Sequence, residues 1–460
     1  MTRRDFLAVS ALAGVADTGA QRVHVTVDVN RKLGVIPADF LGLGYEISSV
    51  STPGLLSATN RAYTQLIRTL APAGVIRVGG ITADYASFRP SAQSVSSPKG
   101  SIVNLSNLRE LASILKATGW KLIWCLNLGT GDVEQAVTEA QAVAAEVGSQ
   151  LLALEIGNEP DLFNRGSSSH RASTYGYADY LEEYRRVKAA IRAKLPSVPF
   201  AGPDAATVTE WVTRFAAEEG SDLKLLTHHY YRECAGPTST LDKLLHPDPK
   251  LGPLLEKLSA ATVASHVPYR FCETNSFCGG GKPGVSDTFG SALWVLDFLW
   301  RLAEGGCAGV NMETGVNQLD FVSSYSPIAD NAAKPEYYGM LAFAHAAGGE
   351  RVSVEVDAGE VNLAAYAVQL SDKLCVTIIN KDESKTADVG IRTNRTFKTA
   401  KALRLRGPTL ESKDGVTFGG SSVTLNADWK PSVPEPLKSK GEVSEVHVPA
   451  ASAVVVNFHE

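Results

Sequence analysis

Two glutamates stand at the polar ends of apolar, strand-like runs. Glu159 lies in "LEIGNEPDLF", where Pro160 stops strand pairing directly after it, and Glu273 lies in "YRFCETNSF". Two carboxyl groups that face a shared gap can cleave a glycosidic bond, because one attacks the anomeric carbon while the other protonates the leaving oxygen. Their surroundings must then hold their pKa values apart. The two positions predict an acid–base pair if the fold brings them together.

Three consecutive glycines follow the second glutamate, in "ETNSFCGGGKPGVSDTF". A phosphate-binding loop needs a Ser or Thr after its glycine–lysine pair, but Lys282 is followed here by Pro283. Glycines leave backbone N–H groups unobstructed, and successive N–H groups can form a nest for an anion. A loop whose glycines only permit a turn is the alternative.

The histidines and cysteines near these runs do not have the spacing of a metal site. His228 and His229 are adjacent, so on a strand they point to opposite faces, and no CxxC pair is present. We therefore expect no metal and no cofactor. Cys234 and Cys278 fall just past two strand ends, and a disulfide between them is a hypothesis that a count of free thiols tests.

The elements that must position these residues alternate between strand and helix patterns. Eight apolar, β-rich runs are separated by helical patterns with apolar residues at three-to-four spacing. The runs begin at Phe40, Gly74, Lys121, Leu151, Pro199, Leu225, Tyr269 and Ala308. They predict an α/β protein with a (β/α)8 TIM barrel over residues 33–348, whose strands are buried on both faces. Glu159 and Glu273 then end the fourth and seventh strands, at the face where barrel enzymes keep their active sites.

The segments on either side of the expected barrel have other sequence patterns. Residues 349–460 show short β patterns separated by turn residues, which predicts a β-sandwich domain, and residues 21–32 contain another strand that should join it. Residues 1–20 hold Arg3 and Arg4 before a short apolar run, the pattern of a twin-arginine export signal. We therefore expect export to the periplasm or the cell exterior.

Composition narrows the range of partners. Of the 460 residues 44% are apolar and 20% are charged, the net charge is −5, and no basic block appears. This composition is typical of a globular protein and argues against nucleic acid as a partner. No apolar run reaches the roughly 20 residues that span a bilayer, so we expect no membrane span.

Three motifs resemble one group of glycoside hydrolases. The "NEP" of the fourth strand and the "ET" of the seventh resemble the clan A retaining enzymes. With "HHYY" on the sixth strand and "ETNSFCGGGKPGVSDTF" on the seventh, the chain resembles family 79 of that clan, the β-glucuronidases and heparanases. The resemblance covers nearly the whole mature chain. It implies a bacterial β-glucuronidase with Glu159 as general acid/base and Glu273 as nucleophile.

The resemblance also implies a set of substrate-binding residues. They are Glu46, Asp84, Asn158, Tyr230, Gly279, Gly280 and Tyr325. Asn158 would bind the sugar 2-hydroxyl, a contact that strengthens in the transition state. Glu46 and Asp84 would accept hydrogen bonds from other sugar hydroxyls.

The carboxylate of a uronic acid is the group that the glycine loop would hold. By resemblance, backbone N–H groups of Gly279 and Gly280 bind it, and Tyr325 from the loop after the eighth strand assists. Cys278 stands where close relatives have a tyrosine, so no carboxylate contact is expected from that side chain.

Other residues would orient the catalytic pair. By resemblance, Tyr230 reaches Glu273 and holds it in the attacking orientation, and His228 points the same way and supports it. Arg77 either orients Glu273 or forms a purely structural ion pair. Glu313, at the end of the eighth strand, is expected to be a hydrogen-bonding wall residue.

These inferences predict a retaining exo-β-glucuronidase. Such an enzyme removes terminal β-linked glucuronic acid from an oligosaccharide, a polysaccharide or a glycoside. An endo-acting, heparanase-like hydrolase of a glucuronic-acid-containing polysaccharide is the alternative among enzymes. A non-catalytic carbohydrate-binding barrel is the alternative from another class, and the presence of both glutamates argues against it.

Overall fold

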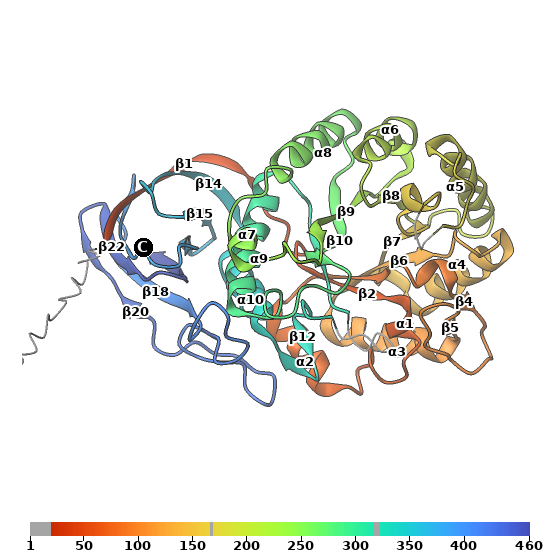
Figure 1. The fold of residues 1–460 in the computed structure, drawn as a ribbon, viewed down its shortest axis with the longest axis horizontal. Helices are drawn as coiled ribbons and strands as arrows, with labels where there is room; N and C mark the ends of the chain where they lie inside the picture. The colour runs from red at the N-terminus through yellow and green to blue at the C-terminus, as the bar shows by residue number, and fades with distance from the viewer. Residues whose placement is uncertain (1–19, 166–168, 316–322) are drawn as a thin grey trace, which may run out of the picture.

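The computed structural model describes residues 20–165, 169–315 and 323–460. The expected export signal therefore lies outside the described residues, apart from its last position. The described chain forms a barrel of strands and helices beside a domain made of strands (Figure 1). No helix in the described ranges combines the length and the apolar character needed to cross a membrane.

Eight parallel strands form the barrel, in the order β7-β6-β3-β2-β11-β10-β9-β8. A parallel bridge between Leu154 and Phe200 joins the two ends of this sheet. The barrel strands are β2 (Gly42–Glu46), β3 (Val75–Gly79), β6 (Lys121–Leu126), β7 (Leu151–Ile156), β8 (Ala201–Ala205), β9 (Leu225–Cys234), β10 (Tyr269–Cys278) and β11 (Val310–Glu313). The predicted barrel is confirmed, strand for strand.

Helices surround the strands because most of them have an apolar stripe to bury, whereas α9 and α10 are buried on nearly all sides. They are α1 (Ile47–Val50), α2 (Arg61–Leu70), α3 (Leu105–Thr118), α4 (Val133–Val147), α5 (Tyr177–Arg192), α6 (Thr209–Glu219), α7 (Leu241–Leu245), α8 (Leu251–Ser265), α9 (Phe289–Glu304) and α10 (Pro335–Ala346). Their ends carry ordinary sequence signals. Asn104 and Asn107 form a capping box at the start of α3, and Gly119 ends it in the left-handed conformation.

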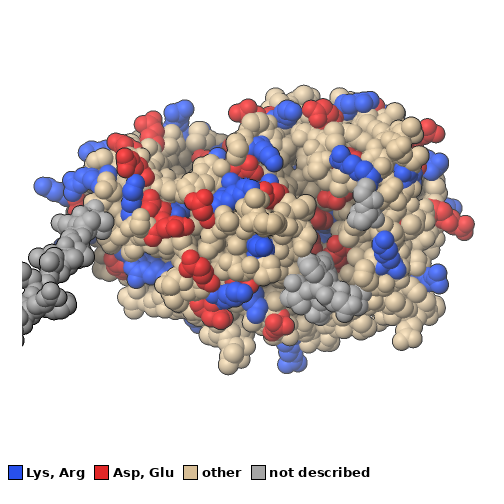
Figure 2. All heavy atoms as spheres, viewed as in Figure 1, with Lys and Arg blue, Asp and Glu red and all other residues tan. Residues whose placement is uncertain are grey.

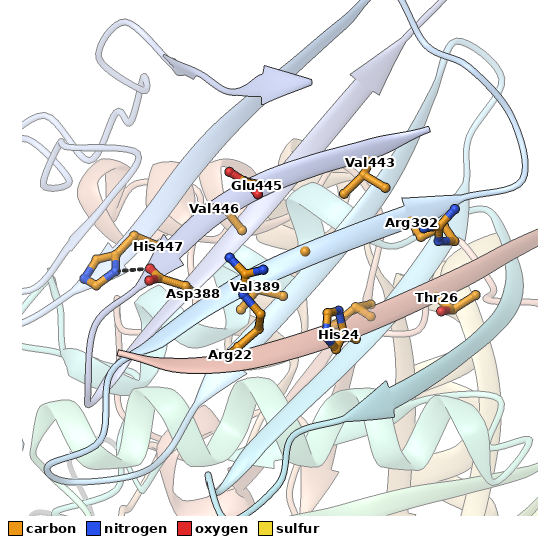
Figure 3. A pocket seen from close by; sticks show the side chains of 12 residues that line it. Arg22, His24, Thr26, Asp388, Val389, Arg392, Val443, Glu445, Val446 and His447 are labelled. Atoms are coloured by element: carbon orange, nitrogen blue, oxygen red, sulfur yellow. Dashed lines mark hydrogen bonds and ion pairs between the residues drawn. The ribbon is translucent and has the colours of Figure 1, made fainter. Parts of the chain in front are cut away.

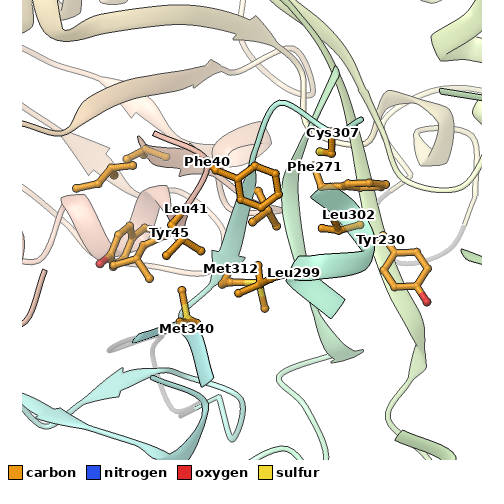
Figure 4. Packing of buried hydrophobic residues seen from close by; sticks show 14 of the residues in the cluster. Phe40, Leu41, Tyr45, Tyr230, Phe271, Leu299, Leu302, Cys307, Met312 and Met340 are labelled. Carbon is orange, nitrogen blue, oxygen red and sulfur yellow. The ribbon is translucent and has the colours of Figure 1, made fainter. Parts of the chain in front are cut away.

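The barrel has an apolar layer inside and a second one outside its wall. The inner layer consists of Val75, Ile123, Ala153, Ala201, Leu225 and Cys272. The outer layer fills the space between the strands and the helices, where Phe271, Met312 and Met340 lie close to Leu299 of α9 (Figure 4). Tyr230 belongs to this outer layer, with its ring stacked on Phe298 at a centroid distance of 5.4 Å.

The other domain is one continuous sheet of eleven strands that surrounds its own core. Its first strand, β1 (Gln21–Val35), pairs with β14 on one side and with β17 on the other. The remaining strands are β14 (Glu350–Asp357), β15 (Leu363–Gln369), β16 (Lys373–Asn380), β17 (Ala387–Thr393), β18 (Thr399–Arg406), β19 (Thr417–Phe418), β20 (Glu435–Pro436), β21 (Lys438–Lys440), β22 (Val443–Val448) and β23 (Ser452–His459). Two short pairs, β4 (Ser87–Phe88) with β5 (Ile102–Val103) and β12 (Ile328–Ala329) with β13 (Ala332–Ala333), lie outside both sheets.

The outer face of β1, β17 and β22 has a hollow of about 570 Å³ (Figure 3). Strand register explains it, because His24 pairs with Gly390, and Gly390 pairs with Glu445. Because Gly390 has no side chain, the space between the outward-facing side chains of His24 and Glu445 stays empty. This hollow belongs to the β domain and not to the mouth of the barrel.

A buried ion pair joins the two domains. Lys381, just after β16, places its Nζ atom 2.6 Å from Oδ2 of Asp297 in α9. The hydroxyl of Tyr366 in β15 donates to the other oxygen of Asp297 at 2.7 Å, and the Tyr366 ring stacks on Trp300. Elsewhere, acidic and basic side chains are interspersed over the surface that Figure 2 shows.

Candidate active site

Polar side chains follow the inner apolar layer toward the C-terminal ends of the strands. Arg77 lies two positions after Val75 on β3, and Glu155 lies two positions after Ala153 on β7, so both point into the barrel. Both side chains are fully buried. A polar layer thus forms directly beneath the mouth of the barrel.

Glu159 lies just beyond β7, not on its last position. Its backbone has a φ of 52°, which is uncommon for a residue other than glycine, and its N–H donates to the carbonyl oxygen of Asp204 at 3.1 Å. Such backbone conformations are costly and cluster at functional sites. The side chain is 23% exposed at the mouth of the barrel.

Glu273 lies on β10, where the pairing with both neighbouring strands shifts between Phe271 and the next paired residues. Its side chain is 13% exposed. Arg77 donates to Oε2 at 2.9 Å, and the hydroxyl of Tyr231 donates to Oε1 at 2.9 Å. Both oxygens of Glu273 are therefore oriented by donors, and the contact expected from Arg77 is confirmed.

The two glutamates meet across His229. One carboxyl oxygen of Glu159, one of Glu273 and a ring nitrogen of His229 all lie within 4.8 Å of one another. Carboxyl groups in retaining glycosidases are about 5–5.5 Å apart, whereas inverting enzymes leave about 6.5–9.5 Å for a water molecule. One oxygen of Glu159 and one of Glu273 are thus nearer to each other than the separation that inverting enzymes use.

Arg77 is the centre of a buried network. Besides Glu273, its guanidinium group binds Glu155 at 3.2 Å, Asn158 at 2.8 Å and Asp204 at 2.5 Å. Because Arg77 donates to the side-chain oxygen of Asn158, the amide nitrogen of Asn158 is the end that remains to donate to a ligand. Asn158 therefore lies where a sugar hydroxyl beside Glu273 could accept from it.

His229 links the acid/base candidate to a buried aspartate. Its Nδ1 lies 2.9 Å from Glu159 and its Nε2 lies 2.8 Å from Asp204. Burial alone would lower the pKa of His229, but the charges of Asp204 and Glu273 raise it well above its usual value. A protonated ring can donate to both carboxyl groups at once.

The surroundings separate the protonation of these carboxyl groups. Burial opposes ionisation of Asp204, but Arg77 and His229 lower its pKa to about 2. Burial raises the pKa of Glu159 above its usual 4.5, Glu273 raises it further, and His229 acts in the opposite direction. Of the carboxyl groups that bind His229, Glu159 is thus suited to keep a proton, whereas Asp204 is held ionised.

The structure shifts two predicted contacts on β9 by one residue. The hydroxyl of Tyr230 donates to Asp248 at 2.6 Å, so the expectation that Tyr230 holds Glu273 is wrong, and Tyr231 does so instead. The expected support from His228 is likewise wrong, because its Nε2 faces Thr209 and His229 lies in the site. Neighbouring residues on a strand point to opposite faces, so an error of one position exchanges the inner and outer sides.

Asp84 is not placed as a sugar acceptor. It is buried, and its carboxyl group accepts hydrogen bonds from the backbone N–H groups of Leu128, Gly129 and Asn158. The expected contact with substrate is therefore replaced by a structural role, in which Asp84 holds the backbone beside Asn158.

Glu46 lies closer to the catalytic pair. It accepts from the N–H of Thr82 at 2.8 Å and from its hydroxyl at 2.5 Å. Burial and the charge of Glu273 raise the pKa of Glu46 to about 7. Glu46 is therefore at the rim of the site and is poised between its charged and neutral forms.

The glycine loop adopts a conformation that other residues rarely reach. Gly279, Gly280 and Gly281 have φ values of 74°, 87° and 80°. Ser324 donates from its N–H and its hydroxyl to the carbonyl oxygen of Gly280, and Tyr325 follows directly. Within the described residues, the N–H of Gly280 has no hydrogen-bond partner. The loop after β10 is thus tied to the loop after β11.

Tyr325 reaches the catalytic cluster through another aromatic ring. It is buried, and its ring stacks on that of Tyr231 at a centroid distance of 6.4 Å. The hydroxyl of Tyr231 binds Glu273. Tyr325 and the glycine loop therefore flank the nucleophile candidate from one side.

The hypothesis of a disulfide is confirmed. Cys234 and Cys278 are bonded, and they are paired neighbours at the ends of β9 and β10. The bond lies directly before Gly279. The remaining cysteines, Cys125, Cys272, Cys307 and Cys375, are buried and free.

Sequence reasoning missed His229 and Tyr231 as parts of the site, and it favoured a loop-capping role for Asp204 over a place in the mouth. Asp204 lies near the end of β8 in "AGPDA", and an aspartate at the end of a barrel strand is the signal for the second role. Glu159, His229 and Glu273 are also close enough to surround a cation. Both nitrogens of His229 lie within hydrogen-bond distance of carboxyl groups.

Comparison with known proteins identifies the class. Residues 347–455 match the family model for the glycosyl hydrolase family 79 C-terminal beta domain. The chain is 27% identical over 421 residues to a β-glucuronidase of Aspergillus niger, covering 82% of this chain and 75% of that one. It is 29% identical over 320 residues to a β-glucuronidase of Neurospora crassa, covering 58% of this chain and 55% of that one.

Solved structures share the fold. A 4-O-α-L-rhamnosyl-β-D-glucuronidase from Fusarium oxysporum 12S has a TM-score of 0.77 at 21% identity, covering 94% of this chain and 99% of that one. A GH51 α-L-arabinofuranosidase from Thermotoga petrophila RKU-1 has a TM-score of 0.70 at 14% identity, covering 95% and 99%. The protein is thus a glycoside hydrolase. It carries the C-terminal β domain of family 79, and its resemblance to that family is confirmed.

Proposed function

We propose that the protein is a retaining exo-β-glucuronidase that removes terminal β-linked glucuronic acid by double displacement. The observation that carries the proposal is the pair Glu159 and Glu273, which lie within 4.8 Å across His229 in unlike surroundings. The two curated relatives, both named β-glucuronidase, support the choice of sugar.

The proposed reaction has two steps. Glu273, held by Arg77 and Tyr231, attacks the anomeric carbon while Glu159 gives its proton to the leaving oxygen. The glycosyl–enzyme bond forms as the glycosidic bond breaks. Glu159, now ionised, takes a proton from water, and the resulting attack on the anomeric carbon releases glucuronic acid and restores Glu273.

A chromogenic aryl β-glucuronide tests the mechanism. The E159A and E273A variants should each lose hydrolysis of the substrate, and azide should rescue them differently. The nucleophile variant E273A should give an α-glucuronosyl azide, whereas the acid/base variant E159A should give the β-azide. Wild-type activity in E273A would end the proposed mechanism.

The glycine loop and Tyr325 support a preference for a uronic acid. A site built around donors for a carboxylate should cleave β-glucuronides at least about 100-fold faster than β-glucosides, because the donors stay unpaired with a neutral sugar. A panel of aryl β-glycosides measures this ratio. Equal rates on the glucuronide and the glucoside would refute the assignment of the loop.

Exo action is tested with a defined oligosaccharide that contains glucuronic acid. Release of single uronic acid units supports exo action. Larger fragments would instead support the endo-acting alternative.

We also propose that the protein is exported through the twin-arginine route. The pair Arg3 and Arg4 and the short apolar run after it support this, and so does a disulfide, which forms in oxidising compartments. Replacement of both arginines by lysine should leave the protein in the cytoplasm. Unchanged export of that variant would contradict the proposal.

A further inference from the structure

A buried carboxyl group near the nucleophile candidate lacks a side-chain partner among the described residues. Glu313 is the last residue of β11 and is only 2% exposed. Neither of its carboxyl oxygens meets a side-chain donor of the described residues, and the backbone N–H of Gly315 is the donor that acts on it. Leaving a buried polar group unpaired is costly, and such groups in folded proteins call for a specific explanation.

The barrel makes room for this carboxyl group. Gly44 on β2 lies opposite it, and a Cβ atom at Gly44 would come within 2.5 Å of Oε2 of Glu313. β11 lies between β2, which ends at Glu46, and β10, which carries Glu273. Glu313 therefore lies on the floor of the site, between the rim residue and the nucleophile candidate.

Charged and titratable groups from several elements face Glu313. They are Glu46 and Tyr45 of β2, Tyr63 of α2, Arg77 of β3, Tyr231 of β9, Glu273 of β10 and Tyr325 of the loop after β11. Burial and the charges of Glu273 and Glu46 raise the pKa of Glu313 well above its usual value, against the smaller effects of Arg77 and the N–H of Gly315. The raised pKa favours the neutral acid, which has an O–H to donate.

We propose that Glu313 is a substrate-binding residue whose protonated carboxyl group donates a hydrogen bond to the carboxylate of the bound uronic acid. The proposal rests on the proposed β-glucuronidase function. It takes the carboxylate as the acceptor because Tyr325, a close neighbour of Glu313, is tied to the glycine loop through Ser324. A donor at this place completes the ring of donors that the loop begins.

The proposal also explains how an acidic site accepts an acidic sugar. Glu46, Glu273 and Glu313 together would repel a carboxylate if all three were ionised. With Glu313 protonated, its share of the repulsion is removed and an attraction takes its place. Apolar surroundings can keep a carboxylic acid neutral at pH 7 for this kind of donation.

The test compares E313Q and E313A with a matched control, E139Q. Glu139 is also a buried glutamate with a raised pKa, but it lies on α4 and binds Trp124 outside the barrel interior. KM and kcat are measured for an aryl β-glucuronide and an aryl β-glucoside between pH 5 and 9.

Wild-type protein should bind the glucuronide more weakly as pH rises, because ionised Glu313 repels the carboxylate. E313Q keeps a donor that does not titrate, so the pH dependence of its KM should be weaker than that of the wild type, with the part due to Glu46 remaining, while kcat is kept. E313A should raise KM for the glucuronide about tenfold or more and leave KM for the glucoside unchanged. E139Q should match the wild type with both substrates.

Three results would overturn the inference. They are an unchanged KM in E313A, an equal loss on glucuronide and glucoside, and an E313Q variant with the pH dependence of the wild type. If E313A does not fold, the comparison of E313Q with the wild type decides alone. Wild-type protein that cleaves the glucoside but not the glucuronide would overturn the proposed function and this inference together, whereas the other results leave the proposed function intact.

Discussion

At the scale of single residues, Arg77 and His229 give the carboxyl groups in the mouth different partners. Asp204 binds both cations and is held ionised, with a pKa of about 2. Glu273 binds Arg77, whereas Glu159 binds only the shared His229. Two glutamates of the same chemistry can thus take the opposite roles of nucleophile and acid.

Tyr231, and not Tyr230, holds Glu273, and this assignment gives a direct prediction. Tyr231→Phe removes the donor to Glu273 and should lower kcat roughly 10- to 100-fold, the lower range for loss of a preorganised donor. Tyr230→Phe is the matched control and should retain kcat, because its hydroxyl binds Asp248 outside the barrel. Steady-state kinetics on an aryl β-glucuronide measure both. The reverse ranking of the two variants would contradict the assignment.

The pH profile should report the proton on Glu159. The first step needs that proton, so kcat/KM should fall as pH rises through the raised pKa of Glu159. The hydrogen bond and charge of His229 lower that pKa. His229→Gln removes the charge, so the basic limb of the profile should move to higher pH. A shift to lower pH in this variant would show that His229 acts otherwise.

The sequence identified the catalytic pair but not the side of β9 that supports it. Glu159 and Glu273 could be predicted because each ends an apolar run that must be a barrel strand. In "HHYY" each residue type occurs twice in succession, so the pattern does not show which copy points inward. That is set by the pairing of β9 with β8 and β10, and both pairings contain register shifts.

At the scale of elements, burial on both faces made the barrel strands predictable. Their apolar runs are too continuous for surface strands and too short for helices. The pairs β4–β5 and β12–β13 were not predicted, because two-residue strands leave no periodic pattern. The distance of Glu159 beyond β7 was also missed, since the turn around it depends on a tertiary bond to Asp204.

The hydrogen bond between Trp124 of β6 and Glu139 of α4 should make the stability of the protein depend on pH. Glu139 of α4 accepts from the indole N–H of Trp124 in β6 at 2.8 Å, and burial raises its pKa from 4.5 to about 7. The folded protein thus keeps this proton to higher pH than the unfolded chain. The contribution of the group to stability is fully present below pH 4.5 and is lost as pH rises to about 7.

Glu139→Gln tests this dependence, because an amide oxygen can still accept from Trp124 but does not titrate. The free energy of unfolding should fall less in the variant than in the wild type between pH 4.5 and 7. The difference should be about 2–3 kcal/mol, at 1.36 kcal/mol per pKa unit. Urea denaturation across this pH range measures it. Parallel curves for the two proteins would count against a buried, protonated Glu139.

At the scale of the whole molecule, the described chain begins and ends in the same sheet. β1 lies between β14 and β17, so the β domain needs both ends of the described chain, and the barrel is inserted between them (Figure 1). The sequence could suggest this, because the first strand lies outside the eight barrel strands. It could not show that Lys381 and Asp297 would meet, since nothing local marks either residue as buried.

The buried pair between the domains should be worth more than any surface pair. Lys381→Met leaves Asp297 as a buried charge without its cation and should lower the free energy of unfolding by about 3–5 kcal/mol. Lys385→Met is the control, because Lys385 pairs with an exposed Glu360 and should cost at most about 1 kcal/mol. Urea denaturation followed by fluorescence measures both variants. Equal losses would show that the buried pair does not hold the domains together.

The disulfide between Cys234 and Cys278 connects the active site to the redox conditions around the protein. It ties the strand that carries Tyr231 to the strand that carries Glu273, just before the glycine loop. Cys234 is exposed, so a soluble thiol can reach the bond. A reducing agent in a purification or assay buffer therefore acts at the substrate pocket. The redox state of the disulfide belongs in the description of the active site of each sample.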